Sequence, residues 1–237
     1  MVLFNCDMGE GMLYEEAIMP LIDAANISCG YHAGDEDSIK RSVSLAIKHQ
    51  VKIGAHPSFA DKENFGRKEI NLTGGQVYEL VSEQLFLFKK LVSAEGASLH
   101  HVKPHGALYN MAAREPSIAL CIAKAVHDLQ KDLVVFGLSG SMGNEALLSN
   151  GFPVLHETFC DRNYNADGSL MPRNLHNALI ESPELCIKQL KMLLLGYVNL
   201  PGGDKLYLKS DTICIHGDGK NALTLAKAIR NHLDQIS

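Results

Sequence analysis

Histidine and acidic residues recur in this chain of 237 residues at places where an apolar run breaks into Gly or Pro. The pattern occurs five times, at Asn5-Cys6-Asp7, Cys29-Gly30-Tyr31-His32, Gly54-Ala55-His56-Pro57, Lys103-Pro104-His105-Gly106 and Ile215-His216-Gly217-Asp218. Such breaks are typical of strand ends, and in parallel sheets the loops after the carboxyl ends of strands form the ligand crevice. One histidine beside glycine is most often a hydrogen-bonded loop residue. Four in one structural position predict an enzyme site.

Imidazole and carboxylate side chains suit either acid–base chemistry or metal binding. Asp7 and Glu10 follow the first apolar run, where glycines let the backbone turn sharply, although Asp7 could equally accept backbone hydrogen bonds in a turn. A divalent metal could draw three ligands from such a set and keep a position for water. The leading metal candidates are Asp7, His32, His56 and His105, and the further ones are His216 and Asp218. Because no H-x-x-x-H or H-E-x-x-H spacing occurs among them, the sequence leaves both chemistries open.

Basic residues near the predicted strand ends could neutralise an anionic substrate. Lys103 precedes Pro104 and should therefore be extended, where its ammonium can pair with a carboxylate or phosphate. Arg67, Arg162 and Arg173 lie in predicted loops and could each hold a planar anion, or could simply be solvated. Gly219-Lys220 lacks the rest of a G-x-x-x-x-G-K-[ST] motif, so no nucleotide site of that type is encoded.

Short β-rich runs alternate with segments of helical period, which is the pattern of repeated βα units. The predicted strands are Val2–Asn5, Ala24–Ser28, Lys52–Ala55, Leu99–Lys103, Leu133–Leu138, Pro153–Glu157 and Thr212–His216, with a short extra strand at Lys205–Leu208. We expect helices after Asp35, from the capping box at Thr73 to Gly96, after Pro116, after Pro183 and over Asp218–Leu233, the last capped by Asp218. The first of these should bury Ile39, Val43 and Ile47 on one stripe. The irregular stretch 161–174 is expected to be a binding loop.

Seven or eight such units favour a closed or nearly closed (β/α) barrel, since an open sheet of short strands would expose two edges, but a doubly wound open sheet stays possible. No linker is visible, so residues 1–237 are expected to form a single domain. With a net charge of −5 and no basic stripe, nucleic acid is not an expected partner, whereas a small molecule is. The absence of a leader or a long apolar run predicts a cytoplasmic protein that does not associate with membranes.

The motifs resemble those of the LamB/YcsF family over nearly the whole chain. The matching segments occur in the family's order and spacing, and they are Asn5-Cys6-Asp7-Met8-Gly9-Glu10-Gly11, residues 25–35, 54–58, 65–67, 102–110, 157–162, 170–173 and 214–218. Mild departures are Met12 in place of an aromatic residue, Tyr31 and Cys160 in place of the commoner Phe and Ala, and Phe59-Ala60 in place of a Tyr-Pro type pair. The resemblance implies a seven-stranded (β/α) barrel related to glycoside hydrolases and polysaccharide deacetylases.

The family is known as the A-type component of the prokaryotic ATP-dependent 5-oxoprolinase. The resemblance therefore implies hydrolysis of the lactam 5-oxo-L-proline to L-glutamate with two partner subunits, of the B and C type, which would bind the ATP. The implied catalytic residues are Asp7, His32, His56, Lys103, His105 and His216. The implied substrate-binding residues are Asn5, Glu10, Arg67, Tyr109, Asn110, Glu157, Arg162, Arg173 and Asp218.

Two alternatives remain. The chain could be a stand-alone, metal-dependent amidase or deacetylase that acts on an acylated carbohydrate or amine. It could also be a non-catalytic subunit that captures 5-oxoproline or a carbohydrate and passes it on.

Overall fold

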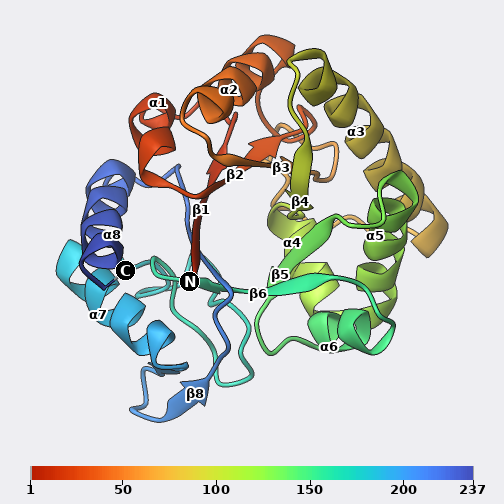
Figure 1. Ribbon diagram of the computed structural model, residues 1–237. Helices are drawn as coiled ribbons and strands as arrows, with labels where there is room; N and C mark the ends of the chain where they lie inside the picture. Colours follow the sequence, from red (N-terminus) through yellow and green to blue (C-terminus); the bar gives the residue numbers. More distant parts are fainter. Residues whose placement is uncertain (1, 237) are drawn as a thin grey trace.

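The computed structural model describes residues 2–236 and shows seven parallel strands that close into a barrel inside a ring of helices (Figure 1). In order around the barrel, the strands are β1 (Leu3–Met8), β2 (Ala24–Ser28), β3 (Lys52–His56), β4 (Leu99–Val102), β5 (Val134–Leu138), β6 (Val154–Phe159) and β9 (Thr212–Ile215). Strand β9 pairs with both β6 and β1 and so closes the sheet. The predicted (β/α) barrel is confirmed, and the alternative of an open sheet is wrong.

The helices follow the strands along the chain and cover the outside of the barrel (Figure 1). They are α1 (Glu15–Ile18), η1 (Met19–Leu21), α2 (Glu36–Lys48), α3 (Gly74–Ala94), α4 (Gly106–Arg114), α5 (Pro116–Leu129), α6 (Met142–Ser149), α7 (Pro183–Leu194) and α8 (Ala222–Ile236). The predicted capping box at the start of α3 is present, because Thr73 accepts from the Gln76 amide and the Gln76 side chain accepts from Thr73. Across residues 2–236, none of these helices combines the length and apolar character needed to cross a membrane.

Two helix predictions need correction. Helix α8 begins at Ala222 rather than at Asp218, whose carboxylate pairs with arginines instead of capping the helix. In α2, Ile39 and Val43 are buried as predicted, but Ile47 is 42% exposed. Two steps of four residues rotate a side chain by about 80° around a helix, so the stripe leaves the core by the third position. Ala46 takes the buried place instead.

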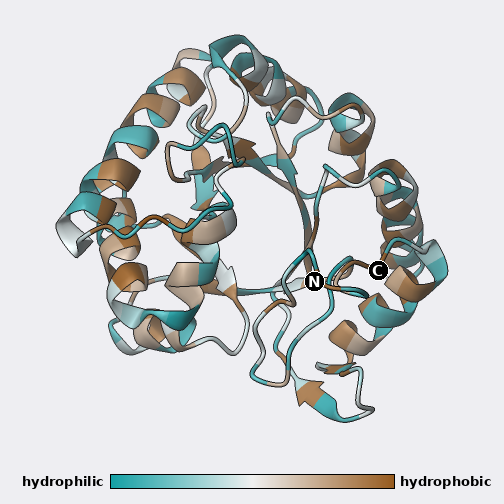
Figure 2. Ribbon diagram, turned by 180° about the vertical axis from the view of Figure 1, so that it is seen from behind, coloured by the Kyte–Doolittle hydropathy of each residue, from teal (hydrophilic) through white to brown (hydrophobic). Residues whose placement is uncertain are grey.

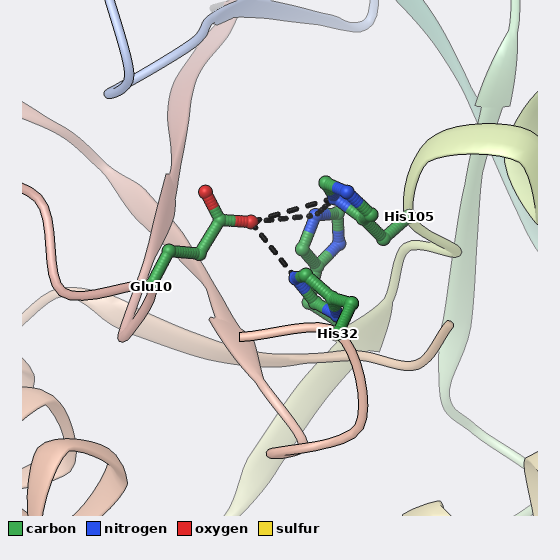
Figure 3. Close-up of side chains that lie close together, drawn as sticks. Glu10, His32 and His105 are labelled. Atoms are coloured by element: carbon green, nitrogen blue, oxygen red, sulfur yellow. Dashed lines mark hydrogen bonds and ion pairs between the residues drawn. The ribbon is translucent and has the colours of Figure 1, made fainter. Parts of the chain in front are cut away.

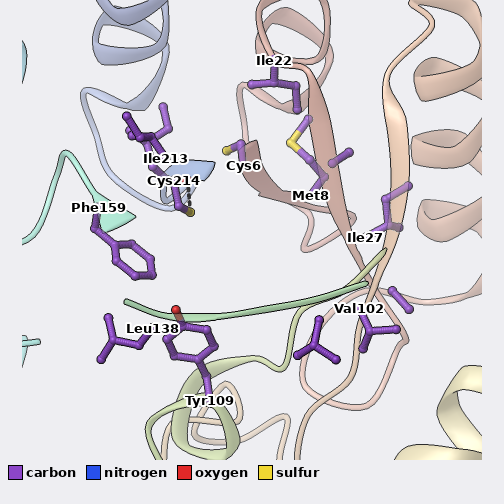
Figure 4. Packing of buried hydrophobic residues seen from close by; sticks show 14 of the residues in the cluster. Cys6, Met8, Ile22, Ile27, Val102, Tyr109, Leu138, Phe159, Ile213 and Cys214 are labelled. Carbon is purple, nitrogen blue, oxygen red and sulfur yellow. Dashed lines mark hydrogen bonds between the residues drawn. The ribbon is translucent and has the colours of Figure 1, made fainter. Parts of the chain in front are cut away.

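The strands separate an apolar outer layer from a polar barrel interior. Along β1, Phe4, Cys6 and Met8 are fully buried with other apolar side chains, as Figure 4 shows for Cys6 and Met8, and Figure 2 shows hydrophobic segments alternating with hydrophilic ones along the helices. Asn5 and Asp7 face the other way, since successive strand residues alternate between faces. The Asn5 side chain donates to Glu157 on β6, a strand that is not a neighbour of β1, so the contact crosses the barrel interior.

Strand β1 is longer than predicted, and this changes the position of Asp7. The prediction ended the strand at Asn5 and placed Asp7 in the following loop, whereas β1 continues to Met8 and pairs Asp7 with Asn26 of β2. The extra strand at Lys205–Tyr207 (β8) does form, but it pairs antiparallel with an unpredicted strand β7 (Tyr197–Asn199) outside the barrel. The stretch 161–174 is irregular, as expected, and takes part in two isolated bridges.

Candidate active site

Four side chains from successive βα units converge at the carboxyl ends of the strands. Glu10 follows β1, His32 follows β2, His56 is the last residue of β3, and His105 follows β4 at the start of α4. One potential ligand atom from each lies within 4.8 Å of all the others, and all four residues are buried. We call these four residues the histidine–glutamate cluster (Figure 3). The strand-end pattern in the sequence thus marks side chains that meet in space.

Short contacts connect the members of the histidine–glutamate cluster. The Glu10 Oε1 atom lies 3.0 Å from His32 Nε2, 3.4 Å from His105 Nδ1 and 3.8 Å from His56 Nε2. The His56 Nε2 and His105 Nδ1 atoms are 2.9 Å apart, and the rings of His32 and His105 stack with centroids 3.8 Å apart. Burial lowers the pKa of His32 to about 2. Burial, with Asp7 nearby, raises the pKa of Glu10 well above its usual value.

A carboxylate from helix α1 fixes the loop that carries Glu10. The Glu15 side chain accepts hydrogen bonds from the backbone amides of Gly9, Glu10 and Met12, at 2.8 to 3.0 Å. Gly9 and Gly11 have φ values of 70° and 79°, a conformation that favours glycine. The tight turn sends the long Glu10 side chain back over the barrel axis, which explains why Glu10 joins the three histidines.

Asp7 was a leading metal candidate in the sequence, but the four-residue set contains Glu10 in its place. Asp7 lies next to the cluster, with its Oδ2 atom 3.4 Å from His56 Nε2. Its other oxygen, Oδ1, accepts from Lys103 Nζ at 2.9 Å and from Asn26 Nδ2 at 2.8 Å. As a strand residue with a short side chain, Asp7 is held inside the barrel by these partners.

Lys103 is the positive centre of the barrel interior. Its Nζ atom lies 2.9 Å from Asp7 Oδ1, 3.2 Å from Glu157 Oε1 and 3.1 Å from Cys214 Sγ. Burial opposes the charge, yet the Asp7 carboxylate raises the pKa of Lys103 well above its usual value. The pKa of Asp7 is correspondingly low, because His56 and Lys103 outweigh its burial. Lys103 and Asp7 therefore form a buried ion pair, which fits the predicted role of Lys103 as a charge partner.

Two further side chains support this ion pair, and sequence reasoning missed both. His101 Nε2 donates to Asn26 Oδ1 at 2.7 Å, and Asn26 Nδ2 in turn donates to both Asp7 and Asn5. The sequence did contain a signal for them, because each is a polar residue inside a predicted strand, and barrel strands covered by helices are usually rich in Val, Ile and Leu.

Tyr109, a predicted site residue, lies beside Glu157, and burial raises the pKa of Tyr109 well above its usual value.

A second group of residues, which we call the arginine group, combines Arg67 from the segment after β3 with residues that follow β6 and β9. All of its members except Asp161 are predicted site residues. His216 Nδ1 is 2.9 Å from Asp161 Oδ2, and both Arg67 and Arg173 form ion pairs with Asp218. Arg162 is also buried, and within residues 2–236 its Nε atom has no hydrogen-bond partner. Burial, together with Arg173, lowers the pKa of Arg162 to about 10. The members of the arginine group are Arg67, Asp161, Arg162, Arg173, His216 and Asp218.

The predicted site residues therefore do not all meet at one point in the structure. His216 joins the arginine group and not the other three histidines. Asn5, Glu157 and Tyr109 are buried near Lys103 in the barrel interior. Asn110 is exposed on α4, because it is rotated by about 100° around the helix from buried Tyr109.

The fold and the polar groups at the strand ends define a class of protein. It is a closed seven-stranded (β/α) barrel, a fold that a family 4 carbohydrate esterase shares. Within that class the chain belongs to the LamB/YcsF family, whose model matches residues 2–237. The predicted family resemblance is therefore confirmed.

Solved structures support this assignment. The chain is 38% identical to a lactam utilization protein from Thermus thermophilus, covering 99% of this chain and 96% of that one, with a TM-score of 0.91. A putative cellobiose-phosphate cleavage protein from Enterococcus faecalis (10% identity, 97% and 94% covered, TM-score 0.55) shares the fold alone. A family 4 carbohydrate esterase from Streptomyces lividans (9% identity, 99% and 88% covered, TM-score 0.53) does so as well.

Proposed function

We propose that this protein is the lactam-binding subunit of an ATP-dependent 5-oxoprolinase and that it hydrolyses 5-oxo-L-proline to L-glutamate together with two partner subunits. Membership of the LamB/YcsF family and the similarity to a lactam utilization protein support this proposal. The observation that carries it is the buried Asp7–Lys103 ion pair, which lies beside the histidine–glutamate cluster at the strand ends of the barrel.

A five-membered lactam resists hydrolysis because amide resonance protects its carbonyl carbon and the ring nitrogen is a poor leaving group. Transfer of the ATP γ-phosphoryl group to the amide oxygen removes that resonance and releases ADP. Water can then add to the carbon, and cleavage of the C–N bond leaves an amine and an acyl phosphate. A second water releases phosphate and completes L-glutamate. We assign ATP binding to the partner subunits, because the chain has no P-loop motif.

Within this reaction, Asp7 orients the attacking water. Its low pKa keeps it a carboxylate, so it accepts a hydrogen bond from water but is a weak base. Of the two predicted histidine partners, His56 lies 3.4 Å from Asp7, whereas His32 contacts Glu10. Lys103 would stabilise negative charge that develops on the oxygen or its phosphate. His105, the other predicted residue for this role, donates its Nε2–H to the Phe65 carbonyl and has no free donor left for it.

His216 is suited to carry the proton from water to the leaving nitrogen. Its Nδ1–H donates to Asp161, and burial lowers the pKa of the imidazole, so that the ring is neutral and Nε2 can accept a proton. The imidazolium that forms is stabilised by Asp161 and can return the proton to the ring nitrogen as the C–N bond breaks. An arginine of the arginine group would hold the α-carboxylate of the substrate.

Reconstitution tests the proposal. The assay follows glutamate and ADP formed from 5-oxo-L-proline and ATP by this chain alone, by B- and C-type partners alone, and by all three together. Only the mixture of all three proteins should form glutamate and ADP. In that mixture, Asp7→Asn should lower the rate by about 10²-fold or more, while the exposed Asp128→Asn should not. Turnover by the partners alone, or a wild-type rate for Asp7→Asn, would refute the proposal.

The histidine–glutamate cluster also supports a second candidate, a metal-dependent amidase or deacetylase that needs no ATP. Release of acetate from acetylated sugars or amines by the isolated chain would favour it. A purely binding subunit would instead bind 5-oxoproline at equilibrium, and replacement of Asp7 would leave the turnover of the complex unchanged.

A further inference from the structure

Two histidines of the cluster face each other through nitrogen atoms that both lack a proton when the rings are neutral. His56 Nδ1 is 2.7 Å from the backbone oxygen of Lys103, and His105 Nε2 is 2.9 Å from the backbone oxygen of Phe65. A carbonyl oxygen only accepts, so each of these nitrogens carries the ring proton. The remaining nitrogens, His56 Nε2 and His105 Nδ1, are then two lone pairs at a separation of 2.9 Å.

Such an arrangement is stable only with a positive charge between the two lone pairs, either a proton or a metal ion. Backbone carbonyls that accept from the outer ring nitrogen are the usual supports of metal-bound histidines, because they fix the tautomer and the ring orientation. Two neighbours supply further donors at the same point. They are Glu10 Oε1, 3.4 Å from His105 Nδ1, and His32 Nε2, 3.0 Å from that oxygen.

The donor separations fit a small ion. Tetrahedral coordination with bonds of about 2.0–2.1 Å places neighbouring donor atoms about 3.3 Å apart. Four of the six donor–donor separations run from 2.9 to 3.8 Å, and all four donors lie within 4.8 Å of one another. Three imidazoles and one carboxylate favour first-row transition metals over Mg²⁺ and Ca²⁺, which prefer oxygen donors.

We propose that the histidine–glutamate cluster binds one divalent transition-metal ion of the zinc class. The ligand atoms are His32 Nε2, His56 Nε2, His105 Nδ1 and Glu10 Oε1. Asp7 lies beside this set, with its Oδ2 atom 3.4 Å from His56 Nε2, while Lys103 and Asn26 hold its Oδ1 atom. The site would give the proposed lactam hydrolysis a Lewis acid at the strand ends of the barrel. The proposal of metal binding itself rests on the positions of these four donor atoms and does not depend on which substrate the protein uses.

Metal binding to the full chain can be measured without any substrate. The protein is stripped with a chelator, dialysed and titrated with Zn²⁺ against a chromophoric competitor, and in parallel with Co²⁺, whose visible absorption reports tetrahedral coordination by nitrogen and oxygen. We expect one equivalent of Zn²⁺ per chain and the visible bands of a tetrahedral Co²⁺ site. The Glu10→Gln and His56→Asn variants should each bind Zn²⁺ more than 100-fold more weakly, beyond the roughly 10–100-fold cost of losing an outer hydrogen-bond partner.

His176→Asn is the matched control, since His176 is exposed and outside the cluster, and it should bind as the wild type does. If a cluster variant does not fold, as judged by circular dichroism, the wild-type stoichiometry and Co²⁺ spectrum still decide the matter. A folded wild-type protein that binds no Zn²⁺ or Co²⁺ overturns the proposal and leaves a proton shared by His56 and His105. That outcome would not affect the reconstitution assay, so the failures of the two proposals can be told apart.

Discussion

The ammonium group of Lys103 compensates two carboxylates in the interior of the barrel, those of Asp7 and Glu157. Removal of one partner from a buried ion pair leaves an uncompensated charge and typically costs about 3–5 kcal/mol. We expect Lys103→Met to lower the free energy of unfolding by an amount in this range. Urea denaturation followed by circular dichroism measures the change.

The exposed Lys124→Met provides the comparison, since Lys124 pairs with Asp128 on the surface of α5, where such pairs contribute little. Equal losses in the two variants would show that the interior charges of the barrel are not coupled as described.

Arg173, which pairs with Asp218, allows a test of how the protein recognises the carboxylate of its substrate. A hydrogen bond to a charged group contributes about 1.5–3 kcal/mol, so Arg173→Ala should raise the KM for 5-oxo-L-proline in the reconstituted enzyme by roughly 10- to 150-fold. A lactam without the carboxylate, 2-pyrrolidinone, should be affected far less by the same change. Equal effects on the KM values of both lactams would show that Arg173 does not bind the substrate carboxylate.

At the level of elements, the loop between β1 and α1 depends on a single side chain. Glu15 accepts three backbone hydrogen bonds from the loop that carries Glu10. Glu15→Ala should loosen this loop and weaken Zn²⁺ binding by about 10- to 100-fold, as expected for an outer support of a ligand. The competitive titration described above measures the loss. In the same helix, Glu16→Ala is the control, and a drop in affinity there as well would indicate general disruption of α1.

Gly54 of β3 has no side chain and so leaves room for the buried imidazole ring of His101 on β4. A Cβ atom at Gly54 would overlap the His101 imidazole, and the register between the two strands shifts at this point. Gly54→Ala should therefore destabilise the protein by about 1–3 kcal/mol, the usual cost of overpacking. Gly75→Ala should do the reverse and stabilise it by about 0.5–1 kcal/mol, because Gly75 lies in helix α3 with open space around it. Thermal and urea denaturation of both variants check the opposite signs.

Periodicity was sufficient to predict the elements that are long or strongly patterned. The seven barrel strands and helices α2, α3, α5 and α7 follow from apolar spacing, capping residues and prolines. The short elements α1, α4 and β7 were missed, since a few residues carry too little pattern. The punctuation of strand ends identified the three histidines of the cluster. It could not show that Glu10 joins them rather than Asp7, because that depends on a glycine turn and on side-chain length.

The His101–Asn26 contact lay beyond sequence reasoning for another reason. The two residues are 75 positions apart, and their meeting requires the register of two neighbouring strand pairs. A polar residue in a predicted strand can face either the helices or the barrel interior. The register decides between these faces, and the sequence of a single strand does not contain it.

On the scale of the whole molecule, the barrel divides the site between two sets of strands. Strands β1 to β4 carry the histidine–glutamate cluster, and β6 and β9, on the other side of β1, precede most of the arginine group. Strand β1, which carries Asp7, is the member of the first set that pairs with β9 of the second set. The proposed substrate has a similar division, because its carbonyl oxygen and its carboxylate are carried by the two carbons that flank the ring nitrogen.

The polar interior also makes the stability of the whole barrel depend on pH. Burial lowers the pKa of His101 well below its usual value of about 6.5, which the unfolded chain regains. Below pH 6.5 the unfolded state therefore binds more protons than the folded state, and the folded state loses stability as the pH falls. One such histidine contributes a slope of up to about 1.4 kcal/mol per pH unit. Burial lowers the pKa of His216 as well, which adds to the effect.

Urea denaturation of the wild type at pH 7.5, 6.5 and 5.5 should show unfolding free energies that fall with acidification, mainly in the last step. His101→Gln keeps an amide donor near the position of Nε2, toward Asn26, but cannot titrate. Its free energy of unfolding should therefore fall less steeply between pH 6.5 and 5.5, even if the variant is less stable at pH 7.5. The raised pKa of Glu10 acts in the opposite direction, so the comparison between the two proteins is the deciding one. A wild-type slope no steeper than that of His101→Gln over this interval would mean that His101 takes up its proton inside the barrel. The neutral ring that donates to Asn26 and stacks on Phe136 would then be the wrong description of the interior.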